Sequence, residues 1–316
     1  MCPFCFYFCI QIMLKTDMED KKSLAGAWVE AARPRTLPAS VSPVLLGCAL
    51  AYYDGMFDIT PAVLCLLVAL FAQIASNFAN DYFDFKKGAD REDRLGPERA
   101  VAQGWITPKA MLTGTFVMLG LACLSGLLLI CFADWRLIWV GLAIAICVLA
   151  YSAGPFPLAY NGLGDVCVLL FYGVIPVCFT YYIQTLSFSL LSFLLSVALG
   201  LLSVNILVVN NYRDYVQDKA GRKRTAIVFF CRKIGRVFYI LNECVAFLLV
   251  LPLVLDAPWW ILFLFGILFA LCFYTTRELL TLEGRALNRT LGHTARNVFL
   301  FAAVLSLLFV YVGSSL

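Results

Sequence analysis

The chain has 316 residues, of which 62% are hydrophobic and 14% are charged, and its formal net charge is +4. This composition is far from that of soluble globular domains and indicates a protein whose solvent is the lipid bilayer. The small positive charge comes without a base-reading motif, so we expect lipid or anionic ligands as partners and no nucleic acid.

The N-terminal segment, residues 1–27, is predicted to be an extension outside the membrane domain. Its first part, MCPFCFYFCIQI, is apolar but too short to cross a bilayer, and it lacks the basic region and cleavage site of a signal peptide. Met13 and Met18 are alternative start positions. Because no Pro-, Gly- or Ser-rich linker divides the rest, we expect one transmembrane domain over residues 28–316.

Nine later segments are long enough to cross a hydrocarbon core of about 30 Å at about 1.5 Å per residue. No alternating pattern of short strands accompanies them, which favours an all-α, polytopic helical bundle over a β-barrel. The predicted spans are residues 37–54, 60–83, 110–133, 136–154, 164–184, 187–211, 236–255, 258–276 and 293–314.

The Lys and Arg residues predict the orientation of these spans. The chain has 24 Lys and Arg residues. All except Arg136 lie before the first span or in the regions around the connections that follow the second, sixth and eighth spans. Positive charge accumulates on the cytoplasmic side of membrane proteins. We therefore expect a cytoplasmic N-terminus, an external C-terminus and a location in the cytoplasmic (inner) membrane.

A polar cluster closes the second span, in the stretch QIASNFANDYFDFKKGAD that starts at Gln73. On a helix, Gln73, Asn77, Asp81 and Asp84 form one polar stripe, which Asn80 flanks. The alternative is an interfacial helix end with solvated charges. A stripe that reaches two turns back into the membrane favours a functional site, because polar groups at that depth are costly.

A second cluster closes the sixth span, in the stretch NNYRDYVQDKAGRKRT that starts at Asn210. Asn210, Asp214 and Asp218 share one helix face. Alone, this stretch could be a basic juxtamembrane segment attracted to anionic lipid. If spans 1–4 and 5–8 are two halves, however, each cluster ends the second helix of its half, and we expect a pseudo-repeat of four-helix units around a central cavity, with a ninth helix added.

Two facing acidic clusters would repel each other unless cations lie between them. Mg²⁺ suits such a site, because it takes oxygen ligands and combines one or two carboxylates with phosphate oxygens. The implied ligand is a lipid diphosphate, with its tail in an apolar groove. Each basic residue beside the clusters is either a phosphate ligand or a topology determinant. These residues are Lys86, Lys87, Arg91, Arg94, Arg99, Lys219, Arg222 and Arg224.

The two clusters resemble the signatures of the UbiA superfamily of intramembrane aromatic prenyltransferases. Asn77, Asp81 and Asp84 match N-x-x-x-D-x-x-D, and Asp214 and Asp218 match D-x-x-x-D. Further stretches resemble the branch that prenylates 1,4-dihydroxy-2-naphthoate in menaquinone synthesis. These are ARPRTLPAS at 32–40, KKGAD at 86–90, GPERAVAQGWI at 96–106, YSAGPFPLAYNGLGDV at 151–166 and GHTARN at 292–297.

The resemblance implies that the enzyme transfers a polyprenyl group from a polyprenyl diphosphate to 1,4-dihydroxy-2-naphthoate, with Mg²⁺ as cofactor, loss of the ring carboxylate and an active site facing the cytoplasm. It also implies three groups of site residues. The first holds the metal and includes four catalytic carboxylates, the second binds the diphosphate, and the third lines a pocket for the acceptor and the prenyl chain. Tyr151 would stabilise an allylic cation, or it is an aromatic-belt residue. The implied sets are, for the metal, Asn77, Asp81, Asp84, Asp214 and Asp218; for the diphosphate, Arg33, Lys87, Arg91, Arg99, Lys219 and Arg222; and for the pocket, Tyr151, Asn80 and Asn210.

Other readings remain open. Another aromatic acceptor, such as 4-hydroxybenzoate or homogentisate, would use the same Asp clusters. A CDP-alcohol phosphotransferase needs Gly after its second Asp, whereas Phe85 follows Asp84 here. A secondary transporter would carry its charges near the membrane midplane, whereas these lie at helix ends. Asp165 either caps the fifth span or faces the acceptor, and we favour the cap.

Overall fold

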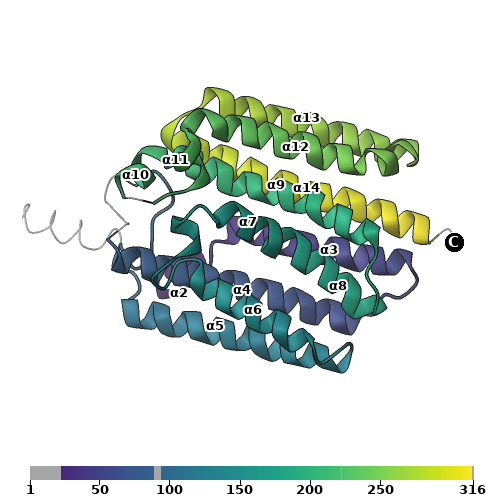
Figure 1. Cartoon of the computed structure of the whole chain (residues 1–316), viewed down its shortest axis with the longest axis horizontal. Helices are drawn as coiled ribbons and strands as arrows, with labels where there is room; N and C mark the ends of the chain where they lie inside the picture. Colours follow the sequence, from purple (N-terminus) through teal and green to yellow (C-terminus); the bar gives the residue numbers. More distant parts are fainter. Residues whose placement is uncertain (1–22, 89–93, 222, 315–316) are drawn as a thin grey trace, which may run out of the picture.

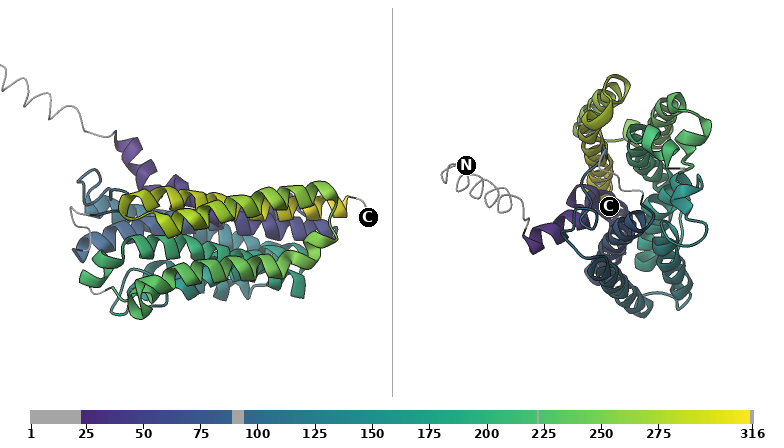
Figure 2. Two further views of the ribbon diagram at one scale, coloured as in Figure 1. Left: turned by 90° about the horizontal axis from the view of Figure 1, so that it is seen from above. Right: turned by 90° about the vertical axis from the view of Figure 1, so that its left-hand side faces the viewer.

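The computed structural model describes residues 23–88, 94–221 and 223–314, and within these ranges the chain forms helices and no strands (Figure 1). The long helices run side by side along one axis, as both views in Figure 2 show. Their bounds are α3 (Leu37–Tyr53), α4 (Ile59–Lys86), α5 (Pro108–Leu128), α6 (Leu137–Ala150), α8 (Ile175–Thr185), α9 (Leu190–Arg213), α12 (Arg232–Leu255), α13 (Trp259–Thr281) and α14 (Leu287–Gly313).

Shorter helices connect or extend these rods, mostly at the end of the bundle where α4 and α9 end, which we call the motif end (left in Figure 1). They are α2 (Leu24–Ala32), η1 (Pro34–Thr36), η2 (Leu129–Cys131), η3 (Leu158–Tyr160), α7 (Gly164–Leu169), η4 (Leu170–Val174), α10 (Tyr215–Ala220), α11 (Ala226–Phe230) and η5 (Gly284–Ala286). Of the predicted N-terminal extension, residues 1–22 lie outside the described residues, and residues 24–27 belong to α2.

Side-chain caps explain where several long helices begin at the opposite end of the bundle and at the motif end. The Asp58 carboxylate accepts the Thr60 N–H at 2.8 Å before α4, and the Ser189 hydroxyl accepts the Ser192 N–H at 3.0 Å before α9. Thr107 caps α5 at the motif end, with Pro108 in its first turn. These local signals agree with the predicted order of spans.

Among the described residues, eight helices are long and apolar enough to cross a membrane. The predicted fourth span, residues 136–154, is too long: α6 has 14 residues and ends at Ala150. At about 1.5 Å per residue such a helix is shorter than a hydrocarbon core of about 30 Å. Gly154, at a φ of +85°, and the two prolines after it end the helix and turn the chain back over the motif end.

The predicted fifth span is not one regular helix. It consists of α7, a π-helical turn at η4 and α8. At this turn the backbone lies against α9, because a Cβ atom on Gly173 would be 2.5 Å from the Cα atom of Gly200. Glycine at both positions therefore permits the close crossing of the two helices.

The interior of the bundle is formed by α3, α8, α9 and α14, where Leu46, Leu199 and Phe301 are fully buried. In contrast, α5, α6, α12 and α13 expose large apolar side chains such as Leu124, Trp139 and Phe263. Extended apolar faces of this kind are suited to lipid contact. The protein is a helical, multi-span membrane protein, as predicted.

Helix pairing repeats between the two halves. The first motif helix, α4, packs against α5, and the second motif helix, α9, packs against α12. The ninth rod, α14, packs against both α3 and α9. This arrangement agrees with the predicted four-helix units and places the ends of α4 and α9 at the same end of the molecule (Figure 1).

Candidate active site

A cavity of about 790 Å³ lies among α3 to α9 and extends from the motif end toward the opposite end of the bundle. Its far part is apolar, with Val44, Leu129 and Ile183 among the lining residues. Leu127, Ile138 and Leu142 line the cavity and are also exposed on the outer surface, so the cavity opens sideways between α5 and α6. A long apolar group could enter from the bilayer by this route.

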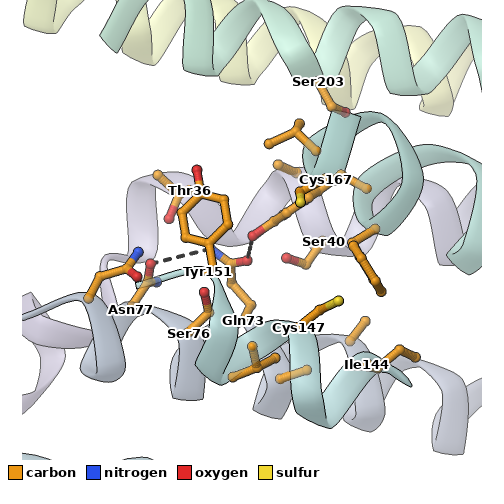
Figure 3. A pocket seen from close by; sticks show the side chains of 18 of the residues that line it. Thr36, Ser40, Gln73, Ser76, Asn77, Ile144, Cys147, Tyr151, Cys167 and Ser203 are labelled. Atoms are coloured by element: carbon orange, nitrogen blue, oxygen red, sulfur yellow. Dashed lines mark hydrogen bonds between the residues drawn. The ribbon is translucent and has the colours of Figure 1, made fainter. Parts of the chain in front are cut away.

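Polar side chains from several helices face the middle of the cavity, as Figure 3 shows for Ser40, Gln73, Asn77 and Tyr151. The Tyr172 hydroxyl donates to the Gln73 side chain, whose amide in turn donates to Asn77 Oδ1 at 3.4 Å. Gln73 and Asn77 belong to the polar stripe that the sequence predicts on α4. Three of the four residues of the stripe, Gln73, Asn77 and Asp84, therefore line the cavity, and the stripe is not a solvated helix end.

The first Asp of the α4 cluster is bound to backbone. The Asp81 carboxylate accepts the Ala100 N–H at 3.0 Å on one oxygen and the Val101 N–H at 3.2 Å on the other. Both residues belong to the loop over residues 94–107, which we call the 94–107 loop, and both are buried. Asp81 thus fixes this loop against α4, and each of its oxygens keeps a second lone pair.

The second Asp of this cluster has side-chain donors. Asp84 accepts Arg99 Nη2 at 2.9 Å and the Tyr160 hydroxyl at 2.9 Å. Arg99 comes from the 94–107 loop and Tyr160 from η3, so two segments that are distant in sequence converge on one carboxylate. Asp84, Arg99 and Tyr160 all line the cavity.

The α9 cluster is neutralised by the chain's own cations. Arg213 forms a two-pronged ion pair with Asp214, with Nε–Oδ1 and Nη2–Oδ2 distances of 2.7 and 2.6 Å. The same guanidinium donates to the side chains of Asn210 and Asn288, each at 2.6 Å. Asn288, in the first turn of α14, also donates to the Leu95 carbonyl at 2.9 Å. Arg213 therefore connects α9, α14 and the 94–107 loop.

Tyr160 lies between the two clusters. Lys87 Nζ is 4.3 Å and Lys223 Nζ is 5.7 Å from the centre of its ring, and Lys223 also pairs with Asp218 at 3.4 Å. Burial lowers the pKa of Lys87, which the Asp84 carboxylate opposes. Burial also raises the pKa of Asp218; Lys223 opposes this shift, and the negative charges of Asp214 and Asp84 add to it. The structure thus brings the two Asp clusters within electrostatic range of each other.

Seven of the residues implied by the resemblance line the cavity: Arg33, Asn77, Asn80, Asp84, Arg99, Tyr151 and Asn210. Asp81, Asp214 and Asp218 are buried beside it, Lys87 donates to the Ser152 carbonyl at 2.6 Å, and Lys219 is exposed. Arg91 and Arg222 lie outside the described residues. Asp165 is not the cap that we favoured: Leu163 precedes α7 without a side-chain cap, and Asp165 lines the cavity.

Sequence reasoning missed five residues at this site: Tyr160, Tyr172, Asn211, Arg213 and Asn288. Arg213 carried a signal, because it lies three residues after Asn210 and directly before Asp214. Tyr160 lies within the stretch 151–166 that carried the resemblance, but nothing in that stretch singled it out; Asn288 carried no signal, since it reaches the site through tertiary contacts.

The donor set fits a hard cation such as Mg²⁺. Asp218 Oδ2 and Asn211 Oδ1 are buried at the site and accept no hydrogen bond. In the part of the chain that the structure describes, no three His, Cys, Asp or Glu residues converge into an all-protein metal cage. A few oxygen ligands without such a cage are what Mg²⁺ uses when phosphate oxygens complete its coordination.

A cavity with acidic and basic side chains at one end and an apolar far part is typical of an intramembrane transferase. Residues 40–293 match the UbiA prenyltransferase family, and the chain belongs to this family. It is therefore a prenyltransferase, as the resemblance implied.

Proteins from several bacteria are similar to this chain. A 1,4-dihydroxy-2-naphthoate octaprenyltransferase of Escherichia coli (strain K12) is 39% identical over 217 residues, 66% of this chain and 70% of that protein. The protein of the same name from Mycobacterium tuberculosis is 37% identical over 235 residues, 73% of this chain and 79% of that protein.

Solved structures share the fold. A UbiA homolog from Archaeoglobus fulgidus bound to GPP and Mg²⁺ matches with a TM-score of 0.61 and 18% identity, covering 89% of this chain and 97% of that chain. At this identity the likeness concerns the fold alone.

Proposed function

We propose that this protein transfers a polyprenyl group from an isoprenyl diphosphate to 1,4-dihydroxy-2-naphthoate, with loss of the ring carboxylate as CO₂ and with Mg²⁺ as cofactor. The observation that carries the proposal is the asymmetry of one cavity. Asp84 and basic side chains line its motif end, with Asp81, Asp214 and Asp218 buried beside it, whereas its far part is apolar and opens sideways between α5 and α6. A lipid diphosphate has the matching asymmetry of charge and tail.

The metal would be held by the predicted set of Asn77, Asp81, Asp84, Asp214 and Asp218, together with the Asn211 oxygen. When bound, Mg²⁺ supplies positive charge that neutralises the leaving diphosphate. Support comes from the acceptor atoms of Asp218 and Asn211 that have no donor. In the structure, Arg213 and Lys223 supply the positive charge that pairs with Asp214 and Asp218.

The basic residues would hold the diphosphate and stabilise its charge as the allylic C1–O bond breaks. Arg33, Arg94, Arg99 and Lys223 line the cavity at this end, and Lys87 lies directly behind it on the Tyr160 ring. An Arg side chain offers a planar fork for phosphate oxygens. We also propose that Arg91, Lys219 and Arg222 bind the diphosphate, because they are basic residues beside the two Asp clusters in the sequence.

The acceptor would lie beside Tyr151, with Asn80 and Asn210 on the polar side of the cavity. A ring carbon forms a bond to C1 of the allyl group as diphosphate leaves, and the Tyr151 ring stabilises the cationic carbon between them. We place the new bond at the carbon that loses CO₂. The electron pair of the departing carboxylate then restores the aromatic ring, so no protein base has to remove a proton.

The acceptor assignment is supported by the names of the similar bacterial proteins. It is tested by incubating the purified protein with Mg²⁺, an isoprenyl diphosphate and a panel of aromatic acids, with products identified by mass spectrometry. We expect the naphthoate to react fastest and to lose its carboxylate. Faster turnover of 4-hydroxybenzoate or homogentisate, or a product that retains the carboxylate, would overturn the assignment.

We further propose that the protein lies in the cytoplasmic membrane with the motif end facing the cytoplasm. The support is the distribution of Lys and Arg, of which only Arg136 falls at the opposite end. Single cysteines introduced at exposed positions of a thiol-free variant, such as Lys109 and Lys219, should resist an impermeant thiol reagent added to intact cells. Labelling of both from outside would reverse the orientation.

A further inference from the structure

Outside the cavity, two arginines at the start of α12 stack on one tyrosine of α9. The guanidinium carbons of Arg232 and Arg236 lie 4.5 and 5.3 Å from the centre of the Tyr212 ring. Tyr212 is 2% exposed, and none of the three residues lines the cavity. We call Tyr212, Arg232 and Arg236 the arginine–tyrosine cluster.

The two guanidinium groups have donors without acceptors. Nε of Arg232 and Nε of Arg236 are buried and make no hydrogen bond. Within the described residues Arg236 has no ion pair, and Arg232 has one contact of 3.5 Å with Glu283, an exposed side chain. Buried donors on a charged group cost free energy unless an acceptor is supplied. Apart from this exposed Glu283 carboxylate, the part of the chain that the structure describes supplies no anion to the cluster.

The surroundings of the cluster indicate which kind of anion fits. Phe229 and Phe230 of α11, which directly precede α12, are 74% and 55% exposed. Below the cluster, Val237, Leu241 and Leu248 form an exposed apolar stripe along the outer face of α12. Lys233 is also exposed at this end. A basic site at the membrane boundary, with aromatic side chains beside it and an apolar stripe below, is complementary to a phosphate that carries acyl chains.

We propose that the arginine–tyrosine cluster binds the phosphate of an anionic phospholipid, whose acyl chains lie along the outer face of α12. The site is distinct from the substrate cavity and takes a lipid of the surrounding membrane. Arg232 and Arg236 donate to the phosphate oxygens, and Phe229 and Phe230 lie at the level of the glycerol backbone. A free phosphate ion would leave these apolar side chains without a partner.

The position of Tyr212 gives the site a second consequence. It stands between Asn211 and Arg213, both of which face the candidate active site. A lipid that holds Arg232 and Arg236 against Tyr212 therefore also holds the end of α9 that carries Asp214. The bound lipid stabilises the fold at the motif end.

The proposal is tested with purified wild-type protein in detergent, to which phosphatidylglycerol or phosphatidylcholine with the same acyl chains is added. Native mass spectrometry measures retained lipid, and thermal unfolding measures stabilisation. We expect preferential retention of phosphatidylglycerol and a higher unfolding temperature with this lipid only. In the Arg232→Gln/Arg236→Gln variant, loss of two basic contacts should weaken retention roughly 10- to 30-fold.

Arg277→Gln is the matched control, because Arg277 is an exposed arginine at the same end of the bundle, on α13, and should leave lipid selectivity unchanged. If the double variant does not fold, Arg236→Gln alone is compared with the same control. Equal retention of the two lipids by the wild type, or undiminished selectivity in a folded variant, would overturn the proposal. So would an equal rise in unfolding temperature with inorganic phosphate, which would assign the site to a free anion.

Discussion

At the end of α4, Asp81 accepts two N–H groups from the backbone of the 94–107 loop, whereas at the end of α9, Asp214 is paired with the Arg213 side chain. Backbone donors in a folded loop stay with their carboxylate. The Asp214 carboxylate is held by a side chain instead, and the same guanidinium also donates to Asn210 and Asn288. The comparison indicates that Asp81 fixes the 94–107 loop against α4, and we propose that Asp214, whose partner is a side chain, holds charge that a metal takes over.

Removing one of the carboxylates that have side-chain partners should have the largest effect. Asp84→Ala, Asp214→Ala or Asp218→Ala should each lower prenyl-transfer turnover about 100-fold or more, which is typical for the loss of one electrostatic contact to a leaving group. Chelation of divalent cations by EDTA should also abolish turnover. Product formation at saturating substrates, followed by mass spectrometry, measures both effects.

Asp256→Ala is the control for these variants, because Asp256 is an exposed carboxylate at the opposite end of the bundle and should be silent. Full activity in EDTA would contradict the role of the metal. Full activity of a folded Asp81/Asp214 double mutant would contradict the role of the two clusters.

Because Asp81 anchors the 94–107 loop, we expect Asp81→Ala to destabilise the protein more than Asp81→Asn does. Asp81→Ala leaves two buried N–H groups without an acceptor, and the free energy of unfolding should fall by about 2 kcal/mol or more. Asp81→Asn keeps one acceptor oxygen and should recover part of this. Thermal unfolding and proteolysis of the 94–107 loop are the measurements. If Asp81→Ala unfolds like the wild type and its loop resists protease, Asp81 does not anchor the loop.

Arg213→Lys should lower turnover about tenfold, although it conserves the charge. A lysine cannot make the paired contacts to Asp214 while also reaching Asn210 and Asn288. Turnover and unfolding temperature should be measured together. Arg289→Lys is the control, since Arg289 is a largely exposed partner of Glu278. Equal effects of the two changes would remove Arg213 from its proposed role as the connection among α9, α14 and the 94–107 loop.

The smallest effect is expected for Tyr160→Phe. The variant loses the hydrogen bond to Asp84, worth about 0.5–1.5 kcal/mol, and turnover should fall only a few-fold. The ring stays between Lys87 and Lys223, whereas Tyr160→Leu removes it and should cost more. Tyr274→Phe, at an exposed tyrosine of α13, is the matched control. A Tyr160→Leu variant as active as Tyr160→Phe would show that the ring does not matter.

Fold prediction succeeded where local patterns are sufficient. A run of apolar residues must satisfy its own backbone in lipid, so length and composition predict each long helix almost directly. At α6 the predicted span ran four residues too far, because residues 151–154 continue the apolar run in sequence but form a turn in the structure, with Gly154 at a φ of +85°. The prediction that Asp165 caps its helix was also wrong. Asp165 lies near the start of α7, where capping residues are common, but it lines the cavity.

By itself, the sequence determined the solvent of this protein, the order of its membrane helices and the two Asp clusters with their family signature, because hydropathy, helical period and motif spacing are local properties. Only the tertiary structure decided what each carboxylate contacts. Asp81 meets backbone from residues 100 and 101, Asp84 meets Tyr160 from another connection, and Arg213 meets Asn288 from the last helix. These partners are set by how the rods pack, and packing depends on contacts between residues far apart in the chain, which no local pattern contains.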